Sequence, residues 1–269
     1  MPTTNLVHSP LAGGPTEIFY REFGAGRPLI FLHGGWGYEI YPLSNEQTSL
    51  PGVRLIAPDR SGYGRSSKPA LFGVDLHPRA AHEMLLFLKA LAIQRCILWG
   101  HSDGAVIACW MAMLAKQSPE VKIEGLILEA LHYDREKPHS RDFFIAMARD
   151  PDSFGEKITS VLAHDHGEQH WRAALIGDGE SWLEIARTAT PDRKDVYDGR
   201  LSEMREVPVA VLHGAGDPRT EPGEIDRVRQ ELPQAEVQLI PNAGHSPHSN
   251  SMSREEFTER LHAVLRKWG

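Results

Sequence analysis

The sequence predicts an α/β fold in which a mostly parallel β-sheet is flanked by helices. Short apolar runs alternate with segments of helical spacing along most of the 269 residues, which is typical of a parallel sheet covered on both faces. Strands buried on both faces are expected to be continuously apolar, as "LIFL" at 29–32 and "VAVL" at 209–212 are. One long segment without such a run interrupts this alternation.

The N-terminal half supplies the first strands and helices of the predicted core. The strands are expected at 16–23, 28–32, 53–57, 96–99 and 123–130. The first two are separated by a glycine-rich turn, and the third ends at a Pro-Asp pair. Helices are predicted where apolar residues recur at helical spacing, at 78–91 and 103–114.

The C-terminal part resumes the alternation. Strands are predicted at 207–212 and 237–240, with a helix at 224–232 between them and an amphipathic helix at 255–268 closing the chain. Segment 132–205 instead is rich in Asp, His, Arg and aromatic residues. A structureless loop of that length is implausible in a compact domain. We therefore predict a helical cap at 132–205, inserted into a core made of 1–131 and 206–269.

Composition and charge exclude several classes of partner. The formal net charge is -7, with no basic tract, so neither nucleic acid nor an anionic membrane is expected. No stretch reaches the roughly 18 apolar residues of a membrane helix, and residues 1–20 do not resemble a secretory signal. Cys96 and Cys109 fall in a predicted strand and helix and are expected to be buried thiols. These features predict a cytoplasmic protein, a monomer or homodimer.

The segment Gly100-His101-Ser102-Asp103-Gly104 connects an apolar strand to an apolar helix. A tight turn in this context projects the serine hydroxyl from the backbone, and glycines two residues before and after relieve the crowding that the turn creates. A serine hydroxyl is a weak nucleophile that needs an adjacent base and an acid to orient that base. The spacing therefore predicts Ser102 as a nucleophile.

Two later residues complete this pattern. Asp217 follows the strand "PVAVLHG", and His245 follows the strand "VQLIP" within a loop of small residues. Both lie just beyond the carboxyl end of a strand, where parallel sheets place their sites. The order serine, acid, histidine predicts Asp217 as the acid and His245 as the base.

A hydrolase of this kind also needs hydrogen-bond donors for the oxyanion. The backbone N–H of Asp103 opens the predicted helix and gains from its dipole. The second donor is expected in the glycine-rich loop after "LIF", from the N–H of Gly35 or of Trp36.

Together these motifs resemble the α/β-hydrolase superfamily, and within it a capped serine hydrolase of the esterase-like branch. The matching stretches are "HGGWG" at 33–37, "PDRSGYGRS" at 58–66, "GHSDG" at 100–104, "HGAGD" at 213–217 and "NAGH" at 242–245. The resemblance implies an eight-stranded sheet with only its second strand antiparallel. It also implies a structural role for the turn that starts at Asp59 and a loop-holding role for His33.

Serine as the nucleophile narrows the implied chemistry to acyl transfer, since dehalogenases and most epoxide hydrolases of this fold use aspartate there. The leading hypothesis is a carboxylesterase acting on small or medium esters through an acyl-enzyme, with no metal or organic cofactor. A C–C bond or lactone hydrolase would share the same triad. Two alternatives belong to other functional classes: a ligand receptor without turnover, and a cofactor-free oxygenase of this fold.

Several further candidates were weighed. His164, His166 and His170 could suggest a metal site, but they lack a second convincing ligand set. Glu129 is a weaker alternative to Asp217 as the acid, and Asp134 is weaker still.

The sequence also offers candidates for the substrate pocket. These are Trp36, His101, Phe143, Phe144, Trp171 and Trp182. A carboxylate directly after the nucleophile is unusual in this family, and the start of a helix stabilises it by roughly 0.3–1 kcal/mol. We therefore expect the Asp103 side chain to disfavour anionic acyl groups.

Overall fold

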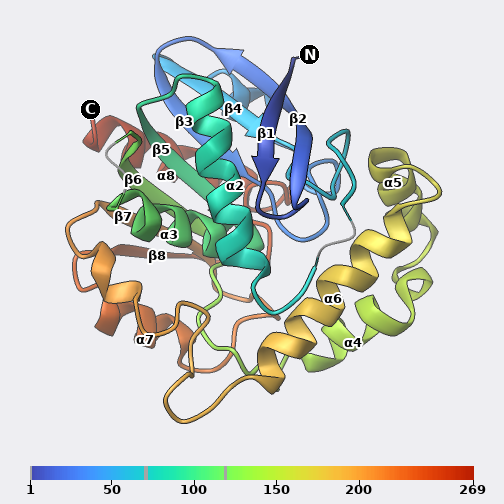
Figure 1. Ribbon diagram of the computed structural model, residues 1–269. Coiled ribbons are helices and arrows are strands. Elements are labelled where there is room, and N and C mark those ends of the chain that lie inside the picture. The colour runs from blue at the N-terminus through green and yellow to red at the C-terminus, as the bar shows by residue number, and fades with distance from the viewer. Residues whose placement is uncertain (1, 70–71, 118–119) are drawn as a thin grey trace.

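The computed structural model describes residues 2–69, 72–117 and 120–269, and within them eight strands form one sheet (Figure 1). The strands are β1 (Thr3–Ser9), β2 (Gly14–Gly24), β3 (Arg27–Leu32), β4 (Val53–Pro58), β5 (Arg95–His101), β6 (Lys122–Glu129), β7 (Val209–Gly214) and β8 (Glu236–Ile240). Their order across the sheet is β1-β2-β4-β3-β5-β6-β7-β8. Only β2 runs against its neighbours, because it pairs antiparallel with both β1 and β4 while the other pairs are parallel. The predicted α/β fold is confirmed.

The register brings the carboxyl ends of the central strands to one edge of the sheet. Leu32 of β3 pairs with Gly100 of β5, and His101 pairs with Glu129 of β6. Glu129 in turn pairs with Leu212 of β7. Loops that leave these strands therefore start side by side, which is where parallel sheets place their sites.

Helices cover both faces of the sheet. The core helices are α1 (Asn45–Thr48), α2 (Leu76–Ala90), α3 (Asp103–Ala115), α7 (Glu224–Glu231) and α8 (Arg254–Lys267). Successive residues of β3 alternate between two apolar cores, with Ile30 packed in the core that contains α2 and α3 and Phe31 in the core that contains α8. This alternation explains why the strands are apolar throughout, since both faces are buried.

The segment between β6 and β7 is largely helical. It contains α4 (Arg141–Arg149), η1 (Pro151–Phe154), α5 (Glu156–His166), α6 (Trp171–Arg187) and η2 (Leu201–Met204). Figure 1 shows α4, α5 and α6 grouped to one side of the sheet. The rings of Phe144 and Trp182 stack at 5.2 Å between α4 and α6. We call residues 132–205 the cap.

Two histidines join this cap to the core loops. His166 accepts a hydrogen bond from the Gly64 N–H at Nδ1 (2.8 Å), and its Nε2 lies 3.1 Å from the Trp36 carbonyl oxygen. The Nε2 of His170 lies 3.0 Å from the carbonyl oxygen of Gly62. These histidines, considered above for a metal site, are engaged in packing the cap against the core, whereas His164 is exposed.

The strand β1 was missed by the sequence analysis. Only Leu6 and Ser9 of its seven residues are buried, so its sequence lacks the apolar run that marks the other strands. Cys96 and Cys109 are buried and unbridged, as predicted. None of the described helices has the length and apolarity needed to cross a membrane.

Candidate active site

Ser102 lies at a sharp turn between β5 and α3. Its backbone has φ 55° and ψ -121°, a strained conformation for a residue with a side chain. The Ser102 N–H donates to the Glu129 carbonyl oxygen at 2.9 Å. A Cβ on Gly100 would collide with the Gly104 carbonyl, and one on Gly104 with the carbonyl of Leu32. The turn therefore requires glycine at both positions.

The structure brings Asp217 and His245 to this serine from loops far along the chain. The Oγ of Ser102 lies 3.0 Å from Nε2 of His245. The Nδ1 of His245 lies 2.9 and 3.0 Å from the two carboxyl oxygens of Asp217. A carboxylate can only accept, so His245 donates from Nδ1 and its Nε2 is left to accept the serine proton. All three side chains are buried.

The charges around this trio suit a base. Burial alone would raise the pKa of Asp217, but the charge and hydrogen bond of His245 hold it well below its ordinary value. Burial lowers the pKa of His245, the Arg219 charge lowers it further, and Asp217 offsets part of this effect. Asp217 is thus ionised and His245 neutral at pH 7, the states needed to take a proton from Ser102.

The glycine-rich loop after β3 lies beside the serine. Its position is set by His33, whose Nδ1 donates to the carbonyl of Gly34 (2.7 Å) and whose Nε2 accepts from the Arg60 N–H (3.1 Å). Arg60 also donates from Nη2 to the same carbonyl at 2.9 Å. His33 therefore has the loop-holding role that was expected.

A small pocket opens next to Ser102 between the core and the cap. The free volume inside it is about 20 Å³, which is room for about one water molecule. The three residues expected to donate backbone N–H groups, Gly35, Trp36 and Asp103, all line it. Across the described residues, no hydrogen bond uses these three N–H groups.

Five of the six aromatic candidates line the pocket, namely Trp36, His101, Phe143, Phe144 and Trp182. Trp171 does not, which corrects that expectation. It begins α6 buried in the apolar core, with the guanidinium of Arg172 over its ring at 4.2 Å.

Residues 29–260 match the model of the Alpha/beta hydrolase family. The chain belongs to the alpha/beta hydrolase family.

Several relatives of this alpha/beta hydrolase are known. It is 36% identical to the AB hydrolase superfamily protein YisY of Bacillus subtilis over 244 residues, which are 85% of this chain and 88% of that protein. It is 29% identical to an epoxide hydrolase of Caballeronia sordidicola over 204 residues, covering 68% of this chain but only 61% of that protein. A solved structure of an esterase from Thermogutta terrifontis superposes with a TM-score of 0.69 at 20% identity, covering 100% and 99% of the two chains.

Two carboxyl groups meet in the pocket of this hydrolase. Asp103 Oδ1 accepts from Nε2 of His77 at 2.6 Å and from Nε1 of Trp182 at 3.0 Å. Burial would raise the pKa of Asp103, but the hydrogen bond and charge of His77 lower it. Burial and then the Asp103 charge raise the pKa of Asp178 well above its ordinary value. The two carboxyl groups therefore differ in acidity, and Asp103 is the stronger acid of the pair.

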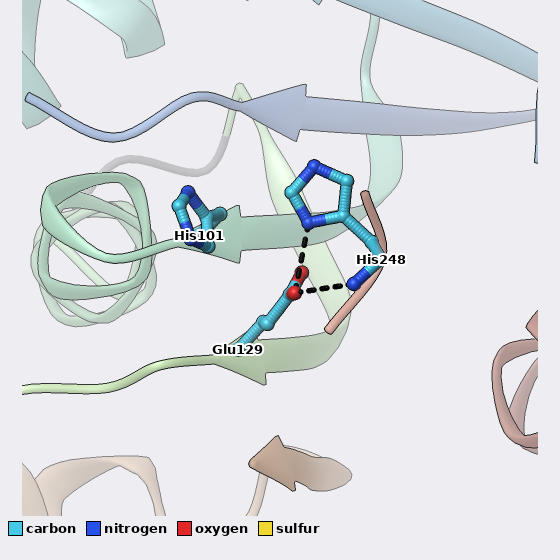
Figure 2. Close-up of side chains that lie close together, drawn as sticks. All are labelled: His101, Glu129 and His248. Carbon is cyan, nitrogen blue, oxygen red and sulfur yellow. Dashed lines mark hydrogen bonds and ion pairs between the residues drawn. The ribbon is translucent and has the colours of Figure 1, made fainter. Parts of the chain in front are cut away.

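The hydrolase has a second histidine–carboxylate pair, formed by His248 and Glu129 (Figure 2). Glu129 Oε1 accepts from Nδ1 of His248 (2.8 Å) and from its backbone N–H (3.0 Å), while Oε2 accepts from Trp99 (3.2 Å). Glu129 thus contacts His248, whereas Asp217 contacts His245. Asp134, the weakest candidate for the acid, pairs with Arg227.

Glu129, His248 and His101 have donor atoms within 4.8 Å of one another. Both nitrogens of His248 are engaged, because Nε2 lies 2.9 Å from the carbonyl oxygen of Tyr41. Nε2 of His101 lies 2.9 Å from Ser246 Oγ. Because these atoms already have protein partners, the group fits a structural network better than a metal centre.

Sequence reasoning missed four polar side chains among the residues that line the pocket of this hydrolase. They are Tyr41, His132, Asp178 and Arg219. Arg219 comes two residues after Asp217, and its guanidinium lies 3.8 Å from the Phe143 ring centroid. His132 is the third residue after β6, which is a position beyond a strand end that could have been considered. No local pattern marks Tyr41 or Asp178.

Proposed function

We propose that this alpha/beta hydrolase is a serine hydrolase that cleaves small to medium carboxylic esters through an acyl-enzyme intermediate. The single observation that carries the proposal is the continuous contact from Ser102 Oγ to His245 Nε2 (3.0 Å) and from His245 Nδ1 to Asp217 (2.9 Å). This arrangement of nucleophile, base and orienting acid is the one that acyl transfer requires.

The reaction uses groups of the chain alone. Ser102 attacks the ester carbonyl while His245 takes its proton, and the oxyanion is stabilised by the backbone N–H groups of Asp103 and of Gly35 or Trp36. His245 then gives the proton to the departing alcohol. A water molecule enters, transfers a proton to His245 and attacks the acyl carbon, which releases the acid and regenerates Ser102. No step calls for an added cofactor.

The pocket supports a restricted class of small-molecule ester. Its free volume of about 20 Å³ and its aromatic walls restrict the group that enters to a small, apolar one. Asp103, the stronger acid of the pair, and Asp178 add an acidic floor, which repels a carboxylate on the acyl part and favours a hydrogen-bond donor or a protonated amine. We propose esters with neutral or cationic acyl groups as substrates.

A cytoplasmic location and a monomeric or dimeric state stay predictions from the sequence.

Relatives with other activities leave a clear alternative to test. One relative is named an epoxide hydrolase and another, from Rhodococcus erythropolis, a non-heme haloperoxidase. In the usual alkyl-ester route to epoxide opening, a carboxylate is the nucleophile, but this chain has Ser102 at the turn and Asp103 turned toward His77 and Trp182. This favours acyl transfer.

The test is a panel of p-nitrophenyl esters and styrene oxide, assayed with the purified protein and with Ser102→Ala. We expect repeated turnover of short-chain esters, no opening of the epoxide, and loss of ester hydrolysis by about 10⁴-fold or more in Ser102→Ala. Ser153→Ala, at an exposed position of the cap, serves as the matched control and keeps full activity. Epoxide turnover without ester turnover would reject the proposal, as would a single turnover followed by a stall.

A further inference from the structure

A second imidazole contacts the nucleophile. His132 follows β6, is only 2% exposed, and places its Nε2 3.4 Å from Oγ of Ser102. Its backbone is held by the Tyr197 hydroxyl, which donates to the His132 carbonyl oxygen at 2.8 Å. Its ring lies edge-on to Trp182 at 4.9 Å and close to parallel with His245, at 5.7 Å and 29°. The triad mechanism assigns this residue no task.

The number of protons available decides which group is the donor in the contact between Ser102 and His132. The Ser102 hydroxyl has one proton, and it points to Nε2 of His245, because the other nitrogen of His245 donates to Asp217. A hydrogen bond between Ser102 and His132 therefore requires His132 to be the donor. Nε2 of His132 carries the proton, and it faces a lone pair of the serine oxygen.

The rest of the ring does not explain its placement. Nδ1 of His132 is buried, with no hydrogen-bond partner in the part of the chain that the structure describes. By contrast, His248, His166 and His33 each engage both ring nitrogens. His213 also has a buried Nδ1 without a partner among the described residues, but its Nε2 contacts Thr220 and not the nucleophile. Among the residues at 2–69, 72–117 and 120–269, the one hydrogen-bond contact of the His132 ring is with the reacting oxygen.

His132 is also in a single charge state at pH 7. Burial keeps its pKa well below the ordinary value, and the charges of Lys137 and Arg219 act in the same direction, against that of Asp217. A neutral imidazole does not compete with His245 for the serine proton when its Nε2 already carries one.

We propose that His132 is a catalytic residue of the second half of the reaction, in which it donates a hydrogen bond from Nε2 to the serine oxygen as the acyl group departs. The inference rests on the proposed function, since it needs an acyl group on Ser102. It goes further by separating the two halves of the cycle.

The chemistry distinguishes those halves. In deacylation, water attacks the acyl carbon and gives a proton to His245, and the C–Oγ bond then breaks with its electron pair moving to Oγ. Oγ takes the proton from His245, and no proton leaves His132. The N–H of His132 lowers the energy of the charge that builds on Oγ in this step. In acylation the serine hydroxyl already accepts this hydrogen bond before it attacks, so the bond strengthens less on the way to the transition state than in deacylation, where it starts at a weakly accepting ester oxygen.

The experiment compares His132→Phe and His132→Leu, which lack the N–H, with His132→Gln, whose amide can place a donor near the Nε2 position. Substrate is p-nitrophenyl acetate, because its leaving group departs easily and deacylation then limits turnover. Stopped-flow release of p-nitrophenol and intact-mass measurement of the acetylated protein report the two steps. Phe144→Leu is the matched control, because Phe144 stacks on the same Trp182 but does not contact Ser102. Thermal melts check that each variant folds.

We expect kcat to fall about tenfold in the Phe and Leu variants, less than the hundredfold or more typical of losing an oxyanion-hole donor. In the same two variants we expect kcat/KM to change less than about threefold and the acetylated fraction of the protein to rise. His132→Gln should restore most of kcat. The control changes KM without raising the acetylated fraction. Parallel losses in kcat and kcat/KM, without acetyl-enzyme accumulation, would overturn the role of His132 alone. Absence of any acetyl group on Ser102 of the wild-type protein would instead overturn the proposed function.

Discussion

The carboxyl groups of Asp103 and Asp178 meet beside Gly35, although one begins a core helix and the other belongs to the cap. Both Oδ2 atoms reach into the space that a Cβ on Gly35 would occupy. Asp103 has two donors, while Oδ1 of Asp178 has no hydrogen-bond partner among the described residues. Core and cap therefore join through an acidic pair at the floor of the pocket, and this pair leads to two predictions.

Asp178→Asn is expected to stabilise the protein increasingly as pH rises. The pKa of Asp178 is raised in the folded state, by burial first and by Asp103 second. The wild-type protein therefore loses stability as pH rises from the unfolded pKa of about 3.9 through the folded value, whereas asparagine does not titrate. A cost of about 1–3 kcal/mol for such a buried group corresponds to a Tm difference of roughly 2–12 °C.

Thermal unfolding between pH 4 and pH 8 checks this prediction. The exposed Asp192→Asn is the control, and its Tm should follow that of the wild-type protein at every pH. A Tm difference for Asp178→Asn that stays constant across this range would show that Asp178 is not the weaker acid of the pair.

Asp103→Asn is expected to change substrate preference. The negative charge that repels anionic acyl groups disappears, while an asparagine oxygen can still accept from Trp182. Turnover of esters with a carboxylate on the acyl chain should rise relative to neutral esters of the same length. The measurement is the ratio of kcat/KM for such a matched pair, and an unchanged ratio would reject the charge filter.

Arg219→Gln is expected to move the acid limb of the activity profile to higher pH. Burial and the Arg219 charge both lower the pKa of His245, and the base works only when it is neutral. Without the guanidinium the pKa of His245 rises, so activity is lost at a higher pH on acidification. The profile of kcat/KM against pH measures this, with Arg219→Lys as the control that keeps the charge. A limb that moves equally in both variants would contradict the electrostatic explanation.

Glu129→Ala is expected to destabilise the fold by about 3–5 kcal/mol, the range for breaking a buried pair by removing one partner. Glu129 binds His248 twice and Trp99 once, and so ties the loop that carries His245 to the sheet. Urea unfolding followed by tryptophan fluorescence measures the loss. Glu124→Ala, which removes partly exposed ion pairs with Arg27 and Arg95, should cost about 1 kcal/mol or less. Similar losses in the two variants would show that Glu129 has no special role.

The placement of the candidate triad could be predicted because it depends on strand order. Ser102, Asp217 and His245 each come shortly after an apolar run, and parallel strands bring their carboxyl ends to one edge. The glycines at 100 and 104 also indicated a tight turn at Ser102, and the structure shows that a Cβ at either position would collide with the backbone. The strand β1 was not predicted, because an edge strand with only two buried residues has no apolar run in its sequence.

The pocket could be predicted only in part, because the local sequence pattern does not determine how the cap packs on the core. Phe143 and Trp171 both look like pocket aromatics in the sequence, but only Phe143 of the two lines the pocket. In the sequence, Asp178 looks like an ordinary polar residue of a helix. Its significance depends on its contact with Asp103, 75 positions earlier in the sequence. Such pairings arise from the orientation of α6, which depends on tertiary contacts.

The most direct test of the proposed catalytic serine is to map a covalent fluorophosphonate adduct by peptide mass spectrometry. The probe reacts with a serine that an adjacent base activates. We predict one adduct, on the peptide that contains Ser102, and none in Ser102→Ala or His245→Ala after the same exposure. An adduct on another residue, or equal labelling of Ser102→Ala, would contradict Ser102 as the nucleophile.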